Sequence, residues 1–162
     1  ASWACSTWRS FARAAGAKAI PAYFTLVGEM PSAIVENIPG NLTPLGNISD
    51  AAELDQIYCD HDILIIPSLT EGFPIVLMEA MAKGCVVMAT PVGDIPYHIA
   101  TDVNGYLFSS VEQPIVLKEA IAWLRQMRTE KVQELSRNAR EYAFKNFGIE
   151  EFNRQYKAIL QP

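Results

Sequence analysis

The sequence has no apolar run long enough to cross a bilayer. Its apolar runs, such as residues 63–66, fall far short of the ~18 residues that a membrane span requires. No charged segment followed by an apolar stretch stands at the amino terminus. Only three cysteines occur, Cys5, Cys59 and Cys85, and no Cys-x-x-Cys pair. The cysteine pattern excludes a disulfide framework and disfavours a thiolate zinc site, so we expect a cytoplasmic protein. From the amino-terminal residues we expect no signal peptide.

Basic residues are scarce in the first two thirds of the chain. Residues 1–111 hold four bases against eleven acids, whereas residues 112–162 hold nine bases against seven acids. The net charge is −5. Since nucleic-acid-binding domains carry a basic patch, we expect no nucleic-acid partner.

Apolar residues are abundant. Half of the 162 residues are hydrophobic and 19% are charged, which predicts one globular domain. The chain begins Ala-Ser-Trp without an initiator Met, which is consistent with processing; of the two explanations we expect the other, a piece of a longer protein.

Strand-like and helix-like segments alternate along the chain. Strands are expected over residues 22–27, 42–45, 62–67, 85–89 and 106–108. Helices are expected over residues 5–17, after Pro31, over 50–58 with a Ser49 cap, over 74–83, after a Ser110–Gln113 capping box, over 132–143 up to Gly148, and within 149–162. This order predicts an α/β fold, with residues 1–162 forming one Rossmann-like domain whose parallel sheet has about five strands and helices on both faces.

Loops that follow strands should carry the chemistry, because parallel sheets bind ligands at the carboxyl ends of their strands. Three such loops stand out, at residues 28–31, 67–73 and 90–96.

The helix expected over residues 74–83 is apolar nearly all round, with the exception of Glu79. A carboxylate among apolar neighbours is unfavourable unless hydrogen bonds or a cation compensate it. Two interpretations stay open: Glu79 caps the amides of a neighbouring loop, or it binds hydroxyl groups of a ligand. A second acid, Glu71, lies on the preceding loop beside Gly72, where the backbone can approach a ligand closely.

The N–H groups of Ile75 and Val76 lie between the two acids, at the expected helix start. Free amides and the helix dipole favour an anion such as phosphate at this point. A bound phosphate would leave one acid on each side for hydroxyl groups. A nucleotide sugar has this layout of sugar, diphosphate and ribose.

From about Phe24 to Phe108 the sequence resembles the carboxyl-terminal domain of glycosyltransferase family 4, retaining enzymes of the GT-B fold. The resemblance is carried by the segments LVGEMP, PLGNIS, DILIIPS, EGFPIVLME, AMAKG, ATPVG and NGYLF. It implies the donor-binding half of a retaining glycosyltransferase of polysaccharide or glycolipid biosynthesis, with the first strand of that half missing from this chain.

The resemblance also implies residue roles. Glu71, as the first motif glutamate, would contact donor-sugar hydroxyls and be the catalytic residue, and Glu79 would contact the ribose. Backbone contacts to the sugar and diphosphate would come from Gly72, Phe73, Pro74, Ile75 and Val76, and contacts to the base from Gly46, Asn47 and Ile48.

The partners that the resemblance implies are a nucleotide-diphosphate sugar, an acceptor sugar or lipid-linked glycan, and the amino-terminal domain of the same protein. We expect no metal or other cofactor. The isolated chain should not turn over, and the full-length protein could lie peripherally on the membrane.

Two departures from the family pattern matter. The family usually holds the diphosphate with an Arg and a Lys that follow the first strand, a segment that we expect this chain to lack. Arg9 and Arg13 come after that segment and are not assigned to the site. The usual Gly-Gly-x-x-Glu is here GDIPY, residues 93–97, in which Tyr97 replaces the acid.

Other motifs have simpler interpretations. Asp60-His61-Asp62 matches the Asp-x-Asp with which glycosyltransferases of another fold hold manganese, but it precedes a strand and so lies at the amino end, away from the ligand edge. We therefore assign no metal to it. Packing roles are assigned to Cys85, Met78 and Met81. His98 is expected to be a packed or a solvated histidine and not a catalytic one.

Two rival functions stay open. One is a stand-alone nucleotide-binding α/β module without catalysis, since the chain lacks the diphosphate clamp. The other is a different GT-B enzyme, such as a glycogen synthase or epimerase relative. A receiver domain is disfavoured, because the strands over 22–27 and 62–67 are not followed by a phosphorylatable Asp.

Overall fold

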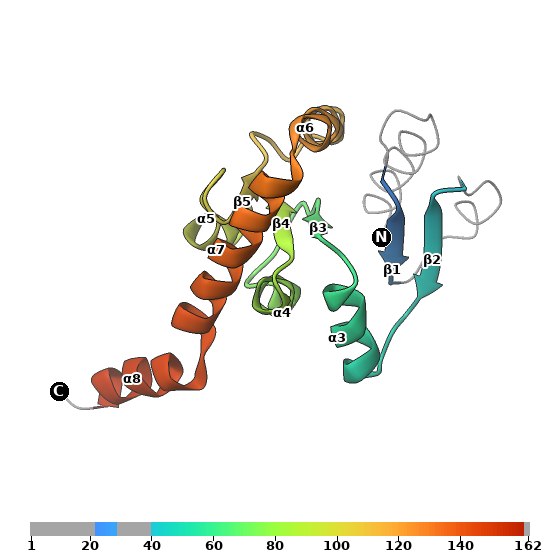
Figure 1. The fold of residues 1–162 in the computed structure, drawn as a ribbon. Helices are drawn as coiled ribbons and strands as arrows, with labels where there is room; N and C mark the ends of the chain where they lie inside the picture. The colour runs from blue at the N-terminus through green and yellow to red at the C-terminus, as the bar shows by residue number, and fades with distance from the viewer. Residues whose placement is uncertain (1–21, 29–39, 161–162) are drawn as a thin grey trace.

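The computed structural model describes residues 22–28 and 40–160, which form parallel strands, with helices packed around β3, β4 and β5 (Figure 1). Strands β1 (Phe24–Val27) and β2 (Leu42–Gly46) pair in parallel. Strands β3 (Ile63–Ile66), β4 (Val86–Ala89) and β5 (Gly105–Leu107) form a second parallel sheet in that order. The helices are α3 (Ala51–Cys59), α4 (Ile75–Lys83), α5 (Ile95–His98), α6 (Gln113–Gln126), α7 (Thr129–Phe147) and α8 (Ile149–Leu160). The predicted α/β class is confirmed.

The strands lie in two sheets instead of the single sheet that the alternation predicted. Within the described residues, no ladder of backbone hydrogen bonds joins β1 to β3. A side-chain bridge links them: His61, just ahead of β3, places Nδ1 2.6 Å from the Ile57 carbonyl oxygen and Nε2 2.6 Å from Thr25 Oγ1 on β1. Because a carbonyl oxygen only accepts, Nδ1 is assigned as the donor to Ile57.

Strand β4 is the centre of the core. All four of its residues have zero exposure, and they alternate between two clusters. Val87 and Ala89 pack against α3 and α4, whereas Val86 and Met88 pack against α6. Each large apolar side chain buried in this way contributes about 1.5–3 kcal/mol. Burial on both faces explains the continuous apolar run of this strand.

Helix α7 takes part in both clusters. Its Leu135 packs with the α6 side, and its Ala139 and Ala143 pack with the α4 side. Figure 1 shows α7 as the long helix that runs past the sheet, followed by α8, which turns away from the body. The small side chains of α7 allow close contact with α4, which carries Glu79.

The helix ends follow the sequence in part. Gly84, with φ +91°, ends α4 in the left-handed conformation, as predicted. Asp50 caps α3 in place of Ser49: its Oδ1 accepts hydrogen bonds from the amides of Ala52 (2.8 Å) and Glu53 (2.9 Å). The first helical residue is Ala51, which leaves Ser49 one position too early.

The predicted capping box at α6 is wrong. The N-cap residue is Glu112, so Ser110 lies two positions too early to reach the first helical turn. Its hydroxyl oxygen instead accepts a hydrogen bond from the Glu112 amide at 3.0 Å.

Several predictions lie outside the described residues. They concern the helix over 5–17 with Arg9 and Arg13, the helix after Pro31, most of the loop over 28–31, and the missing first strand. Within the described ranges, no helix is both long and apolar enough to span a membrane.

Candidate nucleotide-sugar site

The loop after β3 is stabilised by its own polar groups. Ser68 Oγ donates a hydrogen bond to Glu71 Oε1 at 2.5 Å, and Glu71 is half-buried. Thr90, directly after β4, donates its hydroxyl to the Ser68 carbonyl oxygen at 2.5 Å. Glu71 therefore has a defined orientation before any ligand binds.

The loop after β4 lies against this loop. The Asp94 amide donates to the Gly72 carbonyl oxygen at 3.0 Å. Gly93 has φ +55°, and a Cβ added there would collide with the carbonyl oxygens of Glu71 and Gly72. The approach therefore requires glycine. Two of the three loops predicted at the ligand edge are thus joined.

Helix α4 begins directly after this loop, with an open amide end. Pro74 is the N-cap residue, and among the described residues no side chain caps the helix. The Leu77 amide already pairs with the Pro74 carbonyl oxygen. The N–H groups of Ile75 and Val76, whose side chains are 61% and 40% exposed, precede it. Such a start favours an anion.

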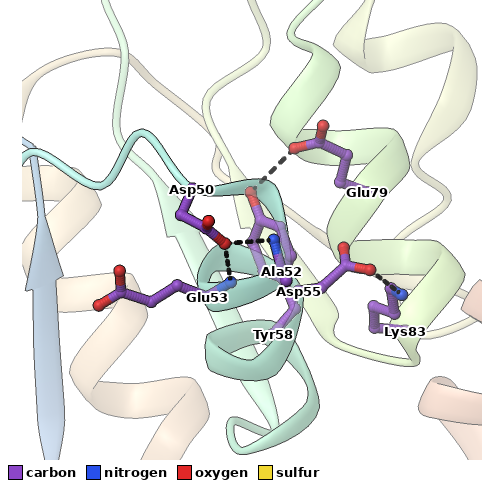
Figure 2. Close-up of polar contacts among 7 residues, drawn as sticks. All are labelled: Asp50, Ala52, Glu53, Asp55, Tyr58, Glu79 and Lys83. Atoms are coloured by element: carbon purple, nitrogen blue, oxygen red, sulfur yellow. Dashed lines mark hydrogen bonds and ion pairs between the residues drawn. The ribbon is translucent and has the colours of Figure 1, made fainter.

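Glu79 lies further along α4 and is half-buried. Its Oε2 accepts a hydrogen bond from the Tyr58 hydroxyl of α3 at 3.2 Å (Figure 2). Within the described part of the chain, its partner is thus a hydroxyl group, and the interpretation of Glu79 as a cap on loop amides is wrong. A side chain that already accepts from one hydroxyl is suited to accept from others.

The predicted base segment follows β2, in the other sheet. Gly46 has φ +71°, and its carbonyl oxygen accepts from the Gly28 amide at 2.7 Å. Asn47 is exposed and Ile48 is half-buried. In residues 22–28 and 40–160 no hydrogen bond joins this segment to the Glu71 loop; α3 connects it to α4.

The Asp-x-Asp motif lies at the amino end of β3, as predicted. Asp60 accepts from the Gln56 side chain, and His61 forms the bridge between the sheets. Across the described residues, no cluster of three or more His, Cys, Asp or Glu side chains is arranged to hold a metal ion.

His98 packs against the motif loop. Its ring centroid lies 5.0 Å from that of Phe73 and 5.1 Å from that of Phe147, and Nδ1 lies 3.1 Å from the Tyr142 hydroxyl. Burial lowers the pKa of His98, and the Asp94 charge opposes this shift more weakly. Of the two predicted alternatives, packed or solvated, the structure therefore shows the packed one. Tyr97, beside it, is 81% exposed.

The remaining packing predictions concern one cysteine and two methionines. Cys85 is 1% exposed, and burial is the main cause that raises the pKa of its thiol to about 12. Met81 is fully buried, whereas Met78 is only partly buried.

Two residues of the site escaped the sequence analysis. Ser68 carries a local signal, because a hydroxyl three residues before an acid in a loop is well placed to hydrogen-bond it. Tyr58 carries none, since it lies 21 residues from Glu79 and the contact depends on how α3 packs on α4.

The fold and the site combine a Rossmann-like α/β domain with a helix start that no described side chain caps, between two hydrogen-bonded carboxylates. The chain belongs to the family of glycosyl transferases group 1, whose model matches residues 3–127. A curated relative, N-acetyl-alpha-D-glucosaminyl L-malate synthase of Bacillus anthracis, is 33% identical over 151 residues, which cover 86% of this chain and 37% of the relative. The chain thus spans little more than a third of that protein.

Solved structures share the fold. Anabaena Alr3699/HepE in complex with UDP superposes with a TM-score of 0.73 at 21% identity, covering 94% of this chain and 44% of that one. The C-terminal domain of a glycosyl transferase group 1 family protein, LpcC of Francisella tularensis, gives 0.71 at 22% identity, covering 89% and 80%. The fold is therefore that of the carboxyl-terminal, Rossmann-like domain of GT-B glycosyltransferases.

Proposed function

We propose that this chain is the donor-binding domain of a retaining glycosyltransferase of family 4, which transfers a sugar from a nucleotide-diphosphate sugar to an acceptor. The observation that carries the proposal is the order of groups along the Glu71 loop and α4: an oriented carboxylate, open amides, then a second carboxylate. Family membership and the UDP complex of a protein with the same fold support it.

In this proposal the donor lies along the start of α4. Glu71 accepts hydrogen bonds from the sugar hydroxyls, and the amides of Ile75 and Val76 face the diphosphate. Glu79 accepts from the ribose hydroxyls, and residues 46–48 meet the base. This order places the bond that breaks, between the anomeric carbon and the phosphate oxygen, between Glu71 and the helix start.

The chemistry follows from the charges. As the diphosphate leaves, negative charge grows on its oxygens, and the amides and dipole of α4 stabilise it. The Glu71 carboxylate stabilises positive charge at the anomeric carbon and holds the sugar in the reactive orientation. A diphosphate carries more charge than one helix start offsets, so further basic side chains come from outside the described residues or from the partner domain.

The whole protein supplies the rest of the site. We propose that its amino-terminal domain holds the acceptor, a sugar or lipid-linked glycan, and that the protein works in the cytoplasm without a metal cofactor. A GT-B active site formed between two domains implies that this chain alone binds nucleotide without turnover.

The test uses the complete protein that contains this chain, because both domains are needed for turnover. Glu71→Ala is expected to lower turnover by about 10²-fold or more, the scale of one preorganised contact. The anomeric configuration of residual product stays retained, and nucleotide affinity barely changes. Glu119→Ala is the matched control, since Glu119 also accepts from a serine, Ser109, but lies on α6.

Two results would contradict the proposal. Near-normal turnover of Glu71→Ala would show that Glu71 has no catalytic role. If Glu71→Ala instead loses UDP or GDP affinity, the sugar does not lie on the Glu71 side of the start of α4. A complete protein that binds nucleotide but transfers no sugar is a binding module. Nucleotide affinity that vanishes with EDTA requires a metal ion and would reopen the assignment of Asp60 and Asp62.

A further inference from the structure

Tyr58 holds Glu79 from a different helix. It lies in the last turn of α3, is 6% exposed, and its ring belongs to the same core cluster as Leu77 and Met81 of α4. Its hydroxyl donates to Glu79 Oε2 (Figure 2). In residues 22–28 and 40–160 no other donor contacts this carboxylate, which leaves Oε1 for a ligand.

The Tyr58 hydroxyl keeps its proton, and the core holds the residue in place. Burial, followed by the charge of Glu79, raises the pKa of Tyr58 far above its ordinary value, so the proton stays on the phenol at physiological pH. The Tyr58 backbone is held as well, because the buried Cys85 thiol donates to its carbonyl oxygen at 3.1 Å. The position of the donor is therefore set by the core and does not depend on a ligand.

We propose that Tyr58 is a positioning residue that fixes the Glu79 carboxylate, with Oε2 held inward and Oε1 presented to the ribose hydroxyls. The proposal rests on the ribose role of Glu79 given above. A glutamate side chain has three rotatable bonds, and ordering them on binding weakens affinity. A carboxylate that is already oriented avoids this loss.

The place of Tyr58 in the chain extends its effect. The other end of helix α3 is capped by the carboxylate of Asp50, which lies two residues after the segment 46–48 proposed to meet the base. The helix that orients the ribose acceptor at one end thus anchors the base segment at the other. Through α3, Tyr58 therefore links Glu79, proposed to bind the ribose, to residues 46–48, proposed to bind the base.

The experiment measures the Kd of two nucleotides by calorimetry in the complete protein that contains this chain. The first is whichever of UDP and GDP binds wild type more tightly, and the second is its 2′,3′-dideoxy form, which lacks both ribose hydroxyls. Tyr58→Phe is expected to weaken binding of the first by about tenfold, the scale of one hydrogen bond to a charged group. Binding of the dideoxy form is expected to stay unchanged.

Three further variants separate positioning from simple packing. Replacing Tyr58 with 4-aminophenylalanine keeps a para N–H donor and is expected to restore the preference for ribose hydroxyls. Tyr106→Phe removes a half-buried hydroxyl from the opposite core cluster and is expected to change neither Kd. Glu79→Gln tests the ribose role itself and is expected to lose the preference.

Each outcome decides a separate point. If wild type and Glu79→Gln both bind the two nucleotides equally, the ribose role is wrong and the positioning role is wrong with it. If Glu79→Gln loses the preference but Tyr58→Phe keeps it, or weakens both nucleotides equally, only the positioning role is wrong. If Tyr58→Phe does not fold, the 4-aminophenylalanine variant decides. A folded 4-aminophenylalanine variant that still prefers the nucleotide over its dideoxy form supports the proposal, and one that binds both equally overturns it.

Discussion

The two carboxylates of the site are held in different ways. Glu71 is held by Ser68, three residues away in the same loop, and that loop is fixed by backbone contacts to the next one. Glu79 is held by Tyr58, 21 residues away on another helix. The first arrangement is local and depends on backbone geometry, whereas the second depends on core packing. We expect the first to respond to changes in the two loops, and the second to changes between α3 and α4.

The largest expected effect comes from Gly93→Ala, which disturbs the loop that holds Glu71 and leaves the Tyr58–Glu79 contact in place. The substitution strains a residue at φ +55° and pushes the added methyl group into the Glu71 and Gly72 carbonyl oxygens. Turnover of the complete protein should fall by about 10²-fold or more, the scale of a 1 Å misplacement in a reacting site. Gly40→Ala, where an added Cβ meets nothing within 4 Å, is the control. Normal turnover of Gly93→Ala would mean that the two loops do not need their close contact.

Ser68→Ala is the milder test of the same side. It removes the hydroxyl that orients Glu71 but keeps the backbone contacts, so kcat should fall by about tenfold. Nucleotide Kd should not change. Ser109→Ala removes the equivalent serine from Glu119 and should leave kcat unaltered. If Ser68→Ala weakens nucleotide binding and leaves kcat unaltered, Glu71 and Glu79 do not divide the donor as proposed.

A smaller effect concerns His98, which packs on Phe73 of the Glu71 loop. Burial lowers the pKa of His98 in the folded chain, so between that value and the unfolded value near 6.5 only the unfolded chain takes up the proton. The contribution of neutral, packed His98 to the free energy of unfolding is complete above about pH 6.5 and is lost as the pH falls through the pKa of His98 in the folded chain. Melting temperatures from pH 7.5 to 5 should fall less steeply in His98→Phe than in wild type. Parallel curves would contradict the assignment.

The smallest effect is expected from Asp55→Ala, on the Glu79 side. Asp55 and Lys83 form an exposed ion pair that also joins α3 to α4, one turn from the Tyr58–Glu79 contact (Figure 2). Because exposed pairs contribute little, the melting temperature should change by no more than about 2 °C. The preference for ribose hydroxyls should remain. A variant that loses this preference would show that the ion pair, and not Tyr58 alone, sets the distance between the helices.

Sequence reasoning succeeded where the determinants are local. The apolar run around Val86 to Ala89 predicted a strand buried on both faces, and Gly84 predicted the end of α4. The order of Glu71, helix start and Glu79 followed from helix geometry. For the contact at Gly93, the sequence predicted only that the loops 67–73 and 90–96 lie at the same edge of the sheet. The need for glycine was not predicted, because it depends on how closely the two backbones approach each other.

Other features depend on contacts between distant segments. The division into two sheets was missed, because the strand pattern of residues 24–27 is the same with or without a neighbour on its far side. The Asp50 cap was placed one residue early, since Ser49 and Asp50 are both good caps and only the helix start decides between them. Tyr58 looked like an ordinary core residue because its partner lies on another helix.

The bridge from His61 to Thr25 has a consequence for which side chains can join the two sheets. His61 uses both ring nitrogens at once: Nδ1 donates to the Ile57 carbonyl oxygen of α3, and Nε2 hydrogen-bonds the Thr25 hydroxyl of β1. A replacement must therefore offer a donor and a second hydrogen-bonding atom on opposite sides of a side chain of the same reach. An ionised glutamate only accepts, and phenylalanine has no polar side-chain atom, so neither would keep both contacts.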